Sequence, residues 1–279
     1  MKKVVKVVRG QDAVDGAGVH LLRVLGRDTA EEFDPFLLLD SFDSRNSEDY
    51  IKGFPMHPHR GIETITYLAE GELIHRDSLG NSGIIKNGGA QWMTAGSGIL
   101  HEEMPQAAER MLGIQLWLNM AGSEKMAEPH YFDITKENIK VVEEEGYHVR
   151  ILSGKFGGVQ GSKTRHIHLS FLDVSLDAGS EIVIPSKFKD TTIVFLLEGD
   201  CTIDGETYHE KSALLFGEGD RVEVEAGAEP SRFLFIEGLP LKESIAWGGP
   251  IVMNTRAELE LAFDELNKNT FIKHKQGLK

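Results

Sequence analysis

Cysteine and long apolar runs are nearly absent from this 279-residue chain, and each shortage excludes a class of protein. The single cysteine, Cys201, cannot form a disulfide within the chain, and its apolar neighbours predict a buried, unreactive thiol in a reducing compartment. No uninterrupted apolar run approaches the ~18 to 20 residues of a membrane span. Residues 1–10 scatter basic side chains among apolar ones and lack a small-residue cleavage site, so they fit a signal peptide poorly. We expect a cytoplasmic protein without a membrane partner, or a nuclear one in a eukaryote.

Positive charge is scarce as well. Thirty Lys and Arg residues stand against 44 Asp and Glu, which gives a formal net charge of -14 at pH 7. Such a surface is repelled by a phosphate backbone, so direct binding of nucleic acid is disfavoured. The 41% of hydrophobic and 27% of charged residues are ordinary for a globular protein, and the length suffices for two domains with their own cores.

Stretches that favour helix are few, whereas 30 glycines separate short runs rich in Val, Ile, Leu, Phe and Thr. Such runs between tight turns are typical of an all-β barrel or sandwich. The expected strands are residues 18–25, 36–40, 63–68, 72–77, 90–94, 111–119, 166–174, 192–197, 200–203 and 232–238. One short helix is expected near the C-terminus, where Thr255 and Glu258 can form a capping box. The apolar stripe that would dock this helix on a barrel consists of Leu259, Ala262, Phe263 and Leu266.

The chain also repeats itself. Residues 67–71 (YLAEG) recur as residues 195–199 (FLLEG), each followed by a second expected strand, and TAGSG at 94–98 is echoed by LFGEG at 215–219. Two copies of one barrel, joined through the charged residues 136–147, explain this pattern. We therefore expect a boundary near residue 145, with one barrel in residues 1–145 and a second barrel plus the helix in residues 146–279.

Two pairs of candidate metal ligands have the same spacing. His57 and His59 stand at i and i+2, as do His101 and Glu103, and side chains two apart on a strand point to the same face. Neighbouring strands can therefore offer all four to one ion. Three imidazoles and a carboxylate suit a divalent ion such as Fe(II), Mn, Co, Ni, Cu or Zn, with bonds of roughly 2.0 to 2.2 Å. One or two positions would stay open for water, substrate or dioxygen.

These motifs resemble those of the pirin family over almost the whole chain. The matching segments are FPMHPHRGIE at 54–63, QWMTAGSGILHEE at 91–103, SEKM at 123–126, GEGD at 217–220 and GPIVMNT at 249–255. The resemblance implies a bicupin, that is, two tandem jelly-roll-like cupin barrels, with iron held in the N-terminal one by His57, His59, His101 and Glu103. It also implies that bacterial and other members cleave the flavonol quercetin with dioxygen, and that animal members act as nuclear transcriptional coregulators.

Glu63 competes with Glu103 for the role of carboxylate ligand, because many cupins carry a glutamate four residues after the second histidine. On a straight strand Glu63 would lie ~13 Å from His59 at ~3.3 Å per residue, although Gly61 permits a bend. The doublet of His101 and Glu103 needs no bend, and the pirin resemblance also favours Glu103. We therefore expect Glu63 to orient a ligand or a water.

The second repeat lacks the ligands. Aligning Gly199 with Gly71 puts Pro185 and Lys187 where His57 and His59 stand. Aligning Gly217 with Gly96 likewise puts Val222 opposite His101 and Val224 opposite Glu103. The C-terminal barrel is thus expected to have a structural or partner-binding role without a metal.

Other residues near these motifs have plainer interpretations. His166 and His168 have no partner doublet and are expected on a solvated strand face. Trp92 and Trp117 either line a pocket for a flat ligand or pack in the core. Arg60 pairs with Glu63 or Asp77 or faces water, and Pro58 favours an edge strand. The isolated histidines, expected to make ordinary surface or capping contacts, are His20, His75, His130, His148, His209 and His274.

The predicted function is that of a metal-dependent dioxygenase acting on flavonol-like or other enolic substrates. Glu103 or a metal-bound hydroxide would take the proton of the acidic substrate hydroxyl. The chain has no dedicated dimer motif, so we expect a monomer. An alternative function is that of a regulatory binding protein, in which the metal sets the shape or redox state of a surface that contacts another protein. A metal-dependent isomerase is a third hypothesis, since the cupin scaffold carries many chemistries.

Overall fold

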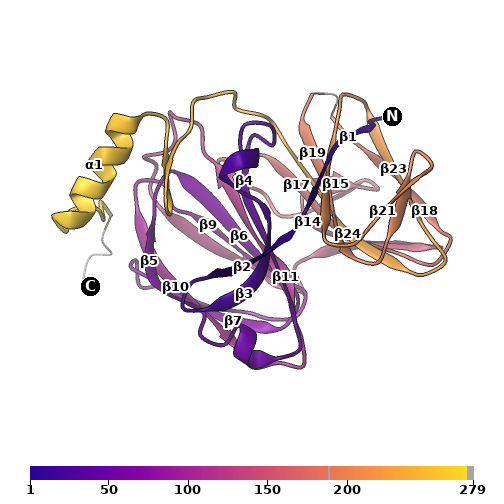
Figure 1. The fold of residues 1–279 in the computed structure, drawn as a ribbon, viewed down its shortest axis with the longest axis horizontal. Helices are drawn as coiled ribbons and strands as arrows, with labels where there is room; N and C mark the ends of the chain where they lie inside the picture. Colours follow the sequence, from indigo (N-terminus) through magenta and orange to yellow (C-terminus); the bar gives the residue numbers. More distant parts are fainter. Residues whose placement is uncertain (188, 275–279) are drawn as a thin grey trace. The chain divides into compact units, whose positions relative to one another are not determined.

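The computed structural model describes residues 1–187 and 189–274 (Figure 1). Contacts divide the chain into two units. The first barrel comprises Asp12–Ala30, Phe36–Lys136 and Leu241–Lys279, and the second barrel comprises Met1–Gln11, Glu31–Pro35 and Glu137–Pro240. The sequence predicted contiguous domains meeting near residue 145. The structure differs, because the N-terminal strand groups with the second barrel and the C-terminal segment, residues 241–274, groups with the first.

The first barrel contains two antiparallel sheets and a small hairpin. The seven-stranded sheet has the order β12 (His130–Ile134), β9 (Gly89–Thr94), β6 (Ile62–Glu70), β11 (Met111–Asn119), β4 (Phe36–Ser44), β3 (Val19–Leu25) and β2 (Gln11–Asp15). The four-stranded sheet has the order β5 (Phe54–His59), β10 (Ile99–Gln106), β7 (Glu72–Asp77) and β8 (Ser82–Ile85). The remaining elements are the 3-10 helices η1 (Arg27–Thr29) and η2 (Ser47–Asp49), the hairpin β25 (Ala246–Gly248) and β26 (Ile251–Met253), and helix α1 (Arg256–Asn267).

The second barrel repeats this arrangement. Its seven-stranded sheet has the order β1 (Val4–Arg9), β22 (Ser212–Phe216), β19 (Thr191–Glu198), β24 (Ser231–Gly238), β17 (Leu169–Leu176), β14 (Tyr147–Ser153) and β13 (Lys140–Glu144). The four-stranded sheet has the order β18 (Glu181–Pro185), β23 (Arg221–Ala226), β20 (Cys201–Ile203) and β21 (Glu206–Tyr208), and a small hairpin pairs β15 (Lys155–Phe156) with β16 (Val159–Gln160). Strand for strand, β19 and β20 correspond to β6 and β7, as the sequence repeat predicted.

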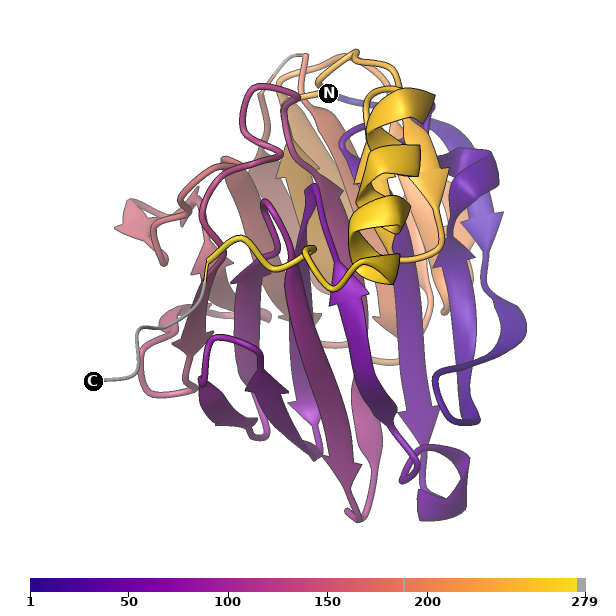
Figure 2. The same ribbon diagram turned by 90° about the vertical axis from the view of Figure 1, so that its left-hand side faces the viewer.

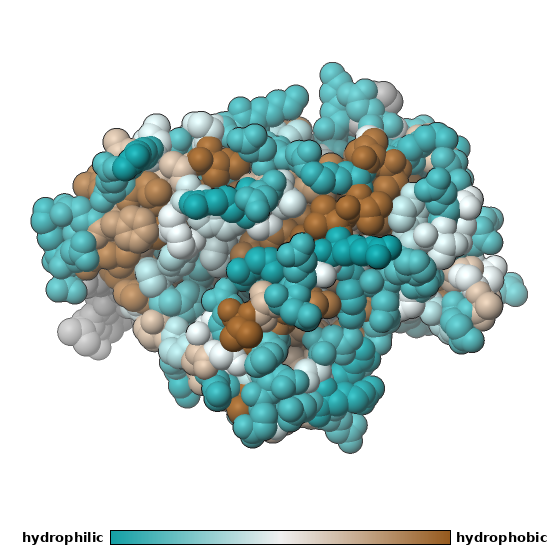
Figure 3. All heavy atoms as spheres, in the orientation of Figure 1, coloured by the Kyte–Doolittle hydropathy of each residue, from teal (hydrophilic) through white to brown (hydrophobic). Residues whose placement is uncertain are grey.

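Alternation along the strands places the cores. In β10 every second residue is buried, so His101 and Glu103 share the inner face with Ile99. The second barrel has one large apolar core, in which Cys201 is 1% exposed. Burial raises the pKa of the Cys201 thiol to about 11, which keeps it protonated and unreactive, as predicted. On the face drawn in Figure 3 hydrophilic residues predominate, and hydrophobic ones gather in a few patches.

Helix α1 begins where the sequence predicted. Thr255 is the N-cap, and its side chain and that of Glu258 form the capping box. The helix buries Ala262 against Ile251, Met253 and Phe271. Figure 2 shows α1 and the segment after it, both in yellow, lying over the purple and magenta strands of the first barrel. Within residues 1–187 and 189–274, none of the helices has the length and apolar character that a membrane crossing needs.

Lys125 fastens the C-terminal segment to the first barrel from inside. Its side chain is buried, and its Nζ donates hydrogen bonds to Gly61 O at 2.8 Å, Asn119 Oδ1 at 2.6 Å and Val252 O at 3.0 Å. One ammonium thus joins the turn after β5, the end of β11 and strand β26. This accounts for a lysine inside the SEKM segment.

We expect Lys125→Met to remove a pH dependence of stability. Burial lowers the pKa of Lys125 from its ordinary value of 10.5 to about 8. Between these two values the unfolded chain binds a proton that the folded chain has released, so this group makes the unfolding free energy rise with pH, by at most about 1.4 kcal/mol per unit. Urea unfolding of both proteins across that window measures the difference, and parallel curves would contradict the assignment.

Candidate metal centre

Two neighbouring strands carry the predicted ligands. His57 and His59 lie on β5, which is the edge strand of its sheet, as Pro58 predicted. β10 pairs with β5 so that His101 lies directly opposite His57, and the register shifts before Glu103. The two doublets therefore come from adjacent strands of one sheet, as their spacing indicated.

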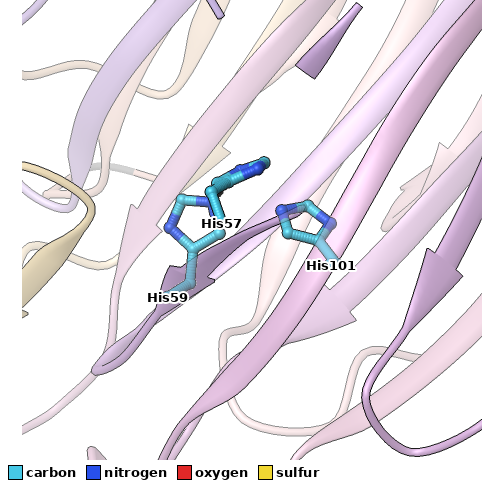
Figure 4. A group of neighbouring side chains, drawn as sticks. All are labelled: His57, His59 and His101. Carbon is cyan, nitrogen blue, oxygen red and sulfur yellow. Dashed lines mark hydrogen bonds between the residues drawn. The ribbon is translucent and has the colours of Figure 1, made fainter. Parts of the chain in front are cut away.

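The three imidazoles converge on one point (Figure 4). One ring nitrogen from each of His57, His59 and His101 lies within 4.8 Å of the others. The ring centroid of His101 is 4.4 Å from that of His57 and 4.9 Å from that of His59. His59 and His101 are each 1% exposed, whereas His57 is partly buried. These three residues form a group that can hold a metal ion.

Backbone carbonyls fix the protons of two of these rings. His57 Nδ1 lies 2.9 Å from Pro55 O and His59 Nδ1 lies 3.0 Å from Pro250 O. A carbonyl oxygen only accepts, so each Nδ1 carries the hydrogen and each neutral ring presents a lone pair at Nε2. These two Nε2 atoms are 3.0 Å apart. Two lone pairs that face each other at that distance repel. A cation bound between them would be coordinated by both nitrogens, which would remove this repulsion.

The environment keeps the imidazoles of His59 and His101 neutral, which is the form that binds a metal. Burial, and then the neighbouring His57, lowers the pKa of His59 to about 3. Burial, and then His59, also lowers the pKa of His101 well below its ordinary value. The Nε2 of His101 is buried and has no hydrogen-bond partner. An orphaned ring nitrogen of this kind fits a metal ligand.

Glu103, predicted as the fourth ligand, lies in the wall of the same cavity as His57 and His59. Its Oε1 accepts a hydrogen bond of 2.6 Å from Thr66 Oγ1, and its Oε2 lies 3.5 Å from Gln115 Nε2. It is not among the groups whose ligand atoms converge within 4.8 Å. The structure thus brings the carboxylate to the site, and its bond to a metal stays a prediction.

Glu63, the competing carboxylate, supports the neighbouring strand. It is fully buried and accepts hydrogen bonds from Trp92 Nε1 at 2.9 Å and Thr94 Oγ1 at 2.6 Å, both on β9. Trp92 is 1% exposed and belongs to the core. Of the two tryptophans considered from the sequence, Trp117 is the one that lines the cavity.

The cavity beside the histidines measures about 620 Å³ and lies within the first barrel. One wall is apolar, and its side chains are Leu38, Phe42, Phe54, Trp117, Trp247 and Pro250. The lining also has a polar part, where Arg23 forms a two-pronged ion pair with Asp40 at 2.9 and 2.7 Å. A cavity that is lined by both aromatic and hydrogen-bonding side chains suits a planar, hydroxylated organic molecule.

Several site residues were missed or misplaced from the sequence. Trp247 and Pro250 reach the cavity from the C-terminal segment, although only the GPIVMNT motif drew attention to that region. His75, predicted at the surface, is 0% exposed and lies beside His101. Arg60, predicted to pair with Glu63 or Asp77 or to face water, is 2% exposed and pairs with Glu265 at 2.7 Å.

The second barrel has apolar residues at the corresponding inner positions. β18 pairs with β23 so that Ile184 lies opposite Val222 and Ile182 opposite Val224. All four are at most 2% exposed. The alignment of Pro185 with His57 is therefore shifted by one residue, because Val222 faces Ile184. His166 and His168 precede β17 instead of lying on it, so the strand predicted at residue 166 starts at Leu169.

Two barrels of the same sheet order, one of them with converging imidazoles, define a bicupin. The chain belongs to the pirin family: residues 18–118 match the Pirin family, and residues 171–272 match the family described as "Pirin C-terminal cupin domain".

Close relatives span nearly the full length. The chain is 40% identical over 278 residues to a pirin-like protein of Caulobacter vibrioides, covering 97% of this chain and 99% of that protein. It is 38% identical over 268 residues to Pirin of Homo sapiens, covering 94% and 91%. A crystal structure of quercetin 2,3-dioxygenase from Acinetobacter baumannii has a TM-score of 0.88 and 32% identity, covering 97% of this chain and 98% of that one.

Proposed function

We propose that His57, His59, His101 and Glu103 bind one divalent transition metal, and that the protein uses it to open the central ring of flavonol-like substrates with dioxygen. The observation that carries the metal is the pair of Nε2 lone pairs 3.0 Å apart on His57 and His59. The name of the Acinetobacter relative supports the reaction. Fe(II) is the proposed ion, with Mn, Co, Ni, Cu and Zn as alternatives for the same ligands.

The cavity has the parts that this reaction needs. The indole rings of Trp117 and Trp247, with centroids 6.0 Å apart, offer a surface against which a flat ring system can lie. Glu103, whose Oε1 accepts a hydrogen bond from Thr66, would take the proton of the substrate hydroxyl. When bound, the metal would supply Lewis acidity that stabilises the resulting oxyanion, and an open position for a reactant. The ring then opens with uptake of dioxygen and loss of carbon monoxide.

Spectra of quercetin test this proposal. Anaerobic mixing of the metal-loaded protein with quercetin is expected to shift the flavonol absorption band, because the bound substrate is deprotonated, and admission of oxygen is expected to bleach it. His20→Ala is the control, since His20 is exposed on the same barrel. A band that persists in oxygen with fully metallated protein would contradict the dioxygenase proposal.

A regulatory binding role is the second candidate. In the second barrel the corresponding inner positions are the apolar residues Ile182, Ile184, Val222 and Val224, so these positions offer no metal ligands, and a partner-binding role is a candidate for that barrel. An acidic protein with net charge -14 suits a basic protein partner. Capture experiments with the ferrous and ferric forms distinguish this role, because it requires partner sets that differ between the two.

A further inference from the structure

A third doublet stands next to the two that hold the proposed metal. β7 pairs with β10 so that His75 lies opposite Glu103 and Asp77 lies opposite His101. The side chains of His75 and Asp77 are both 0% exposed and alternate inward along β7. Three adjacent strands, β5, β10 and β7, thus each present two polar residues at i and i+2 to the inside of one barrel, where burial of polar groups is costly unless they interact.

The ring of His75 lies next to the ring of His101. His75 Nδ1 lies 3.5 Å from His101 Nδ1, and the two ring centroids are 5.2 Å apart. On the other side of the ring, His75 Nε2 lies 3.6 Å from Asp77 Oδ2. The first distance is at the outer limit of a hydrogen bond and the second is just beyond it, as is common in catalytic sites before their ligands bind.

Asp77 is itself held firmly. Its Oδ1 accepts hydrogen bonds from the backbone N–H groups of Leu79 at 2.9 Å and Asn81 at 3.0 Å, and its Oδ2 accepts one from Asn81 Nδ2 at 2.8 Å. The carboxylate therefore has a fixed position from which to act on the Nε2 of His75. A fixed anion behind an imidazole is the arrangement that orients and polarises metal-binding histidines.

The ring plane of His75 is also set. It stacks on Tyr131 with centroids 5.0 Å apart and an interplanar angle of 17°. Tyr131 donates its hydroxyl hydrogen to Asp133 at 2.7 Å. Gly83, which faces His75 across the β7–β8 pair, makes room for this stack, because a Cβ there would lie 1.8 Å from the Tyr131 hydroxyl oxygen.

Only one assignment of hydrogens satisfies this row of atoms. The Nε2 atoms of His101 and His75 both lack a hydrogen-bond partner within 3.5 Å. If His101 binds the proposed metal through its Nε2, the lone pair is on that atom and the hydrogen is on Nδ1. The Nδ1 of His75 must then accept, which leaves the hydrogen of His75 on Nε2, facing the Asp77 carboxylate. Donors and acceptors alternate from His101 through His75 to Asp77.

We propose that His75 and Asp77 are positioning residues that hold the ring of His101 in the orientation and tautomer that bind the metal. This inference rests on the metal site proposed above, and it is independent of the reaction performed there. It adds residues of β7, a strand that contributes no metal ligand, to those that act at the site. If His75 served only to pack, any ring of similar size at this position would leave metal binding unchanged.

Metal titrations separate the two roles. His75→Phe keeps the ring volume and the stack on Tyr131 but cannot accept from His101, whereas His75→Gln can accept through its Oε1. We expect the dissociation constant for Co(II), measured by competition with a chelator, to rise about 10- to 100-fold in His75→Phe and less in His75→Gln. Asp77→Asn is expected to weaken binding in the same direction. His20→Phe, at an exposed histidine of the same barrel, is the matched control and should bind like wild type.

A spectroscopic signal reports the tautomer directly. In the Zn(II)-loaded wild type, the Nδ1 hydrogen of His101 is expected to give a slowly exchanging imidazole proton resonance, which His75→Phe should lose. Dissociation constants within twofold of wild type for both His75→Phe and Asp77→Asn would overturn the inference, and thermal unfolding verifies that each variant is folded. If His75→Phe does not fold, Asp77→Asn decides by the same criterion.

The outcomes also separate this inference from the proposed function. A wild type that binds Co(II) but leaves quercetin unchanged would refute the dioxygenase reaction and leave the positioning role standing. A wild type that binds no Co(II) would refute both.

Discussion

His101→Ala is expected to abolish metal binding and dioxygen uptake together while leaving the barrel folded. His101 is 1% exposed, and its Nε2 is a buried ring nitrogen without a hydrogen-bond partner. Loss of a residue that merely orients a ligand already lowers metal affinity 10- to 100-fold, so loss of a ligand should lower it by more than about 100-fold. Elemental analysis of the purified protein and an oxygen electrode with quercetin measure the two effects.

The controls for this experiment come from the same chain. His57→Ala should lose the metal as well, because its Nε2 faces that of His59 at 3.0 Å. His148→Ala should keep it, since His148 belongs to the second barrel and lies 2.9 Å from Glu143. Removing His101 also relieves the crowding of the imidazoles. The variant is therefore expected to unfold at a temperature close to that of the metal-free wild type. Full metal content in purified His101→Ala would refute the assignment of the site.

Arg60→Met is expected to destabilise the first barrel by about 3 kcal/mol, because it removes two charged hydrogen bonds to backbone carbonyls and a buried charge from its ion pair. Arg60 is 2% exposed, its Nε donates to Ser97 O at 2.7 Å, and one Nη donates to Phe271 O at 2.9 Å. Its other Nη pairs with Glu265 at 2.7 Å, and the guanidinium lies 4.1 Å from the centre of the Phe271 ring. The variant loses the contact to Ser97 and all of the contacts to the C-terminal segment at once.

Thermal and urea unfolding measure this effect, which corresponds to a fall in melting temperature of roughly 6 to 12 °C. The matched control is Arg256→Met, because Arg256 is paired with Glu260 on α1 but its side chain is 89% exposed. An exposed pair of this kind contributes little, so this variant should change stability by less than about 0.5 kcal/mol. If both variants lost the same unfolding free energy, the buried contacts of Arg60 would not stabilise the protein more than the exposed pair of Arg256.

Local patterns in the sequence predicted several of the strands and the start of the helix. Residues 72–77 and 111–119 form strands with the expected ends, and the ends are marked by Gly71 and by the change from apolar to polar residues. Thr255 and Glu258 located the start of α1 because a capping box is a short-range interaction. The i, i+2 spacing likewise located His57, His59 and His101.

Long-range contacts could not be predicted in this way. Nothing in residues 4–9 indicates that β1 pairs with β22, some 200 residues later, because register depends on the partner strand. The contact between His59 and Pro250 is equally remote in sequence. His75 is a different case, because its strand was predicted and its spacing to Asp77 repeats that of the ligands, so the signal was present in the sequence.

Because Trp247 and Pro250 contribute to the cavity, the first barrel cannot be expressed as a fragment that lacks the C-terminal segment and keep a complete site. The first barrel is built from segments that lie before and after residues 137–240, which belong to the second barrel. A fragment that ends near residue 240 would therefore contain His57, His59 and His101 but not the Pro250 carbonyl that orients His59.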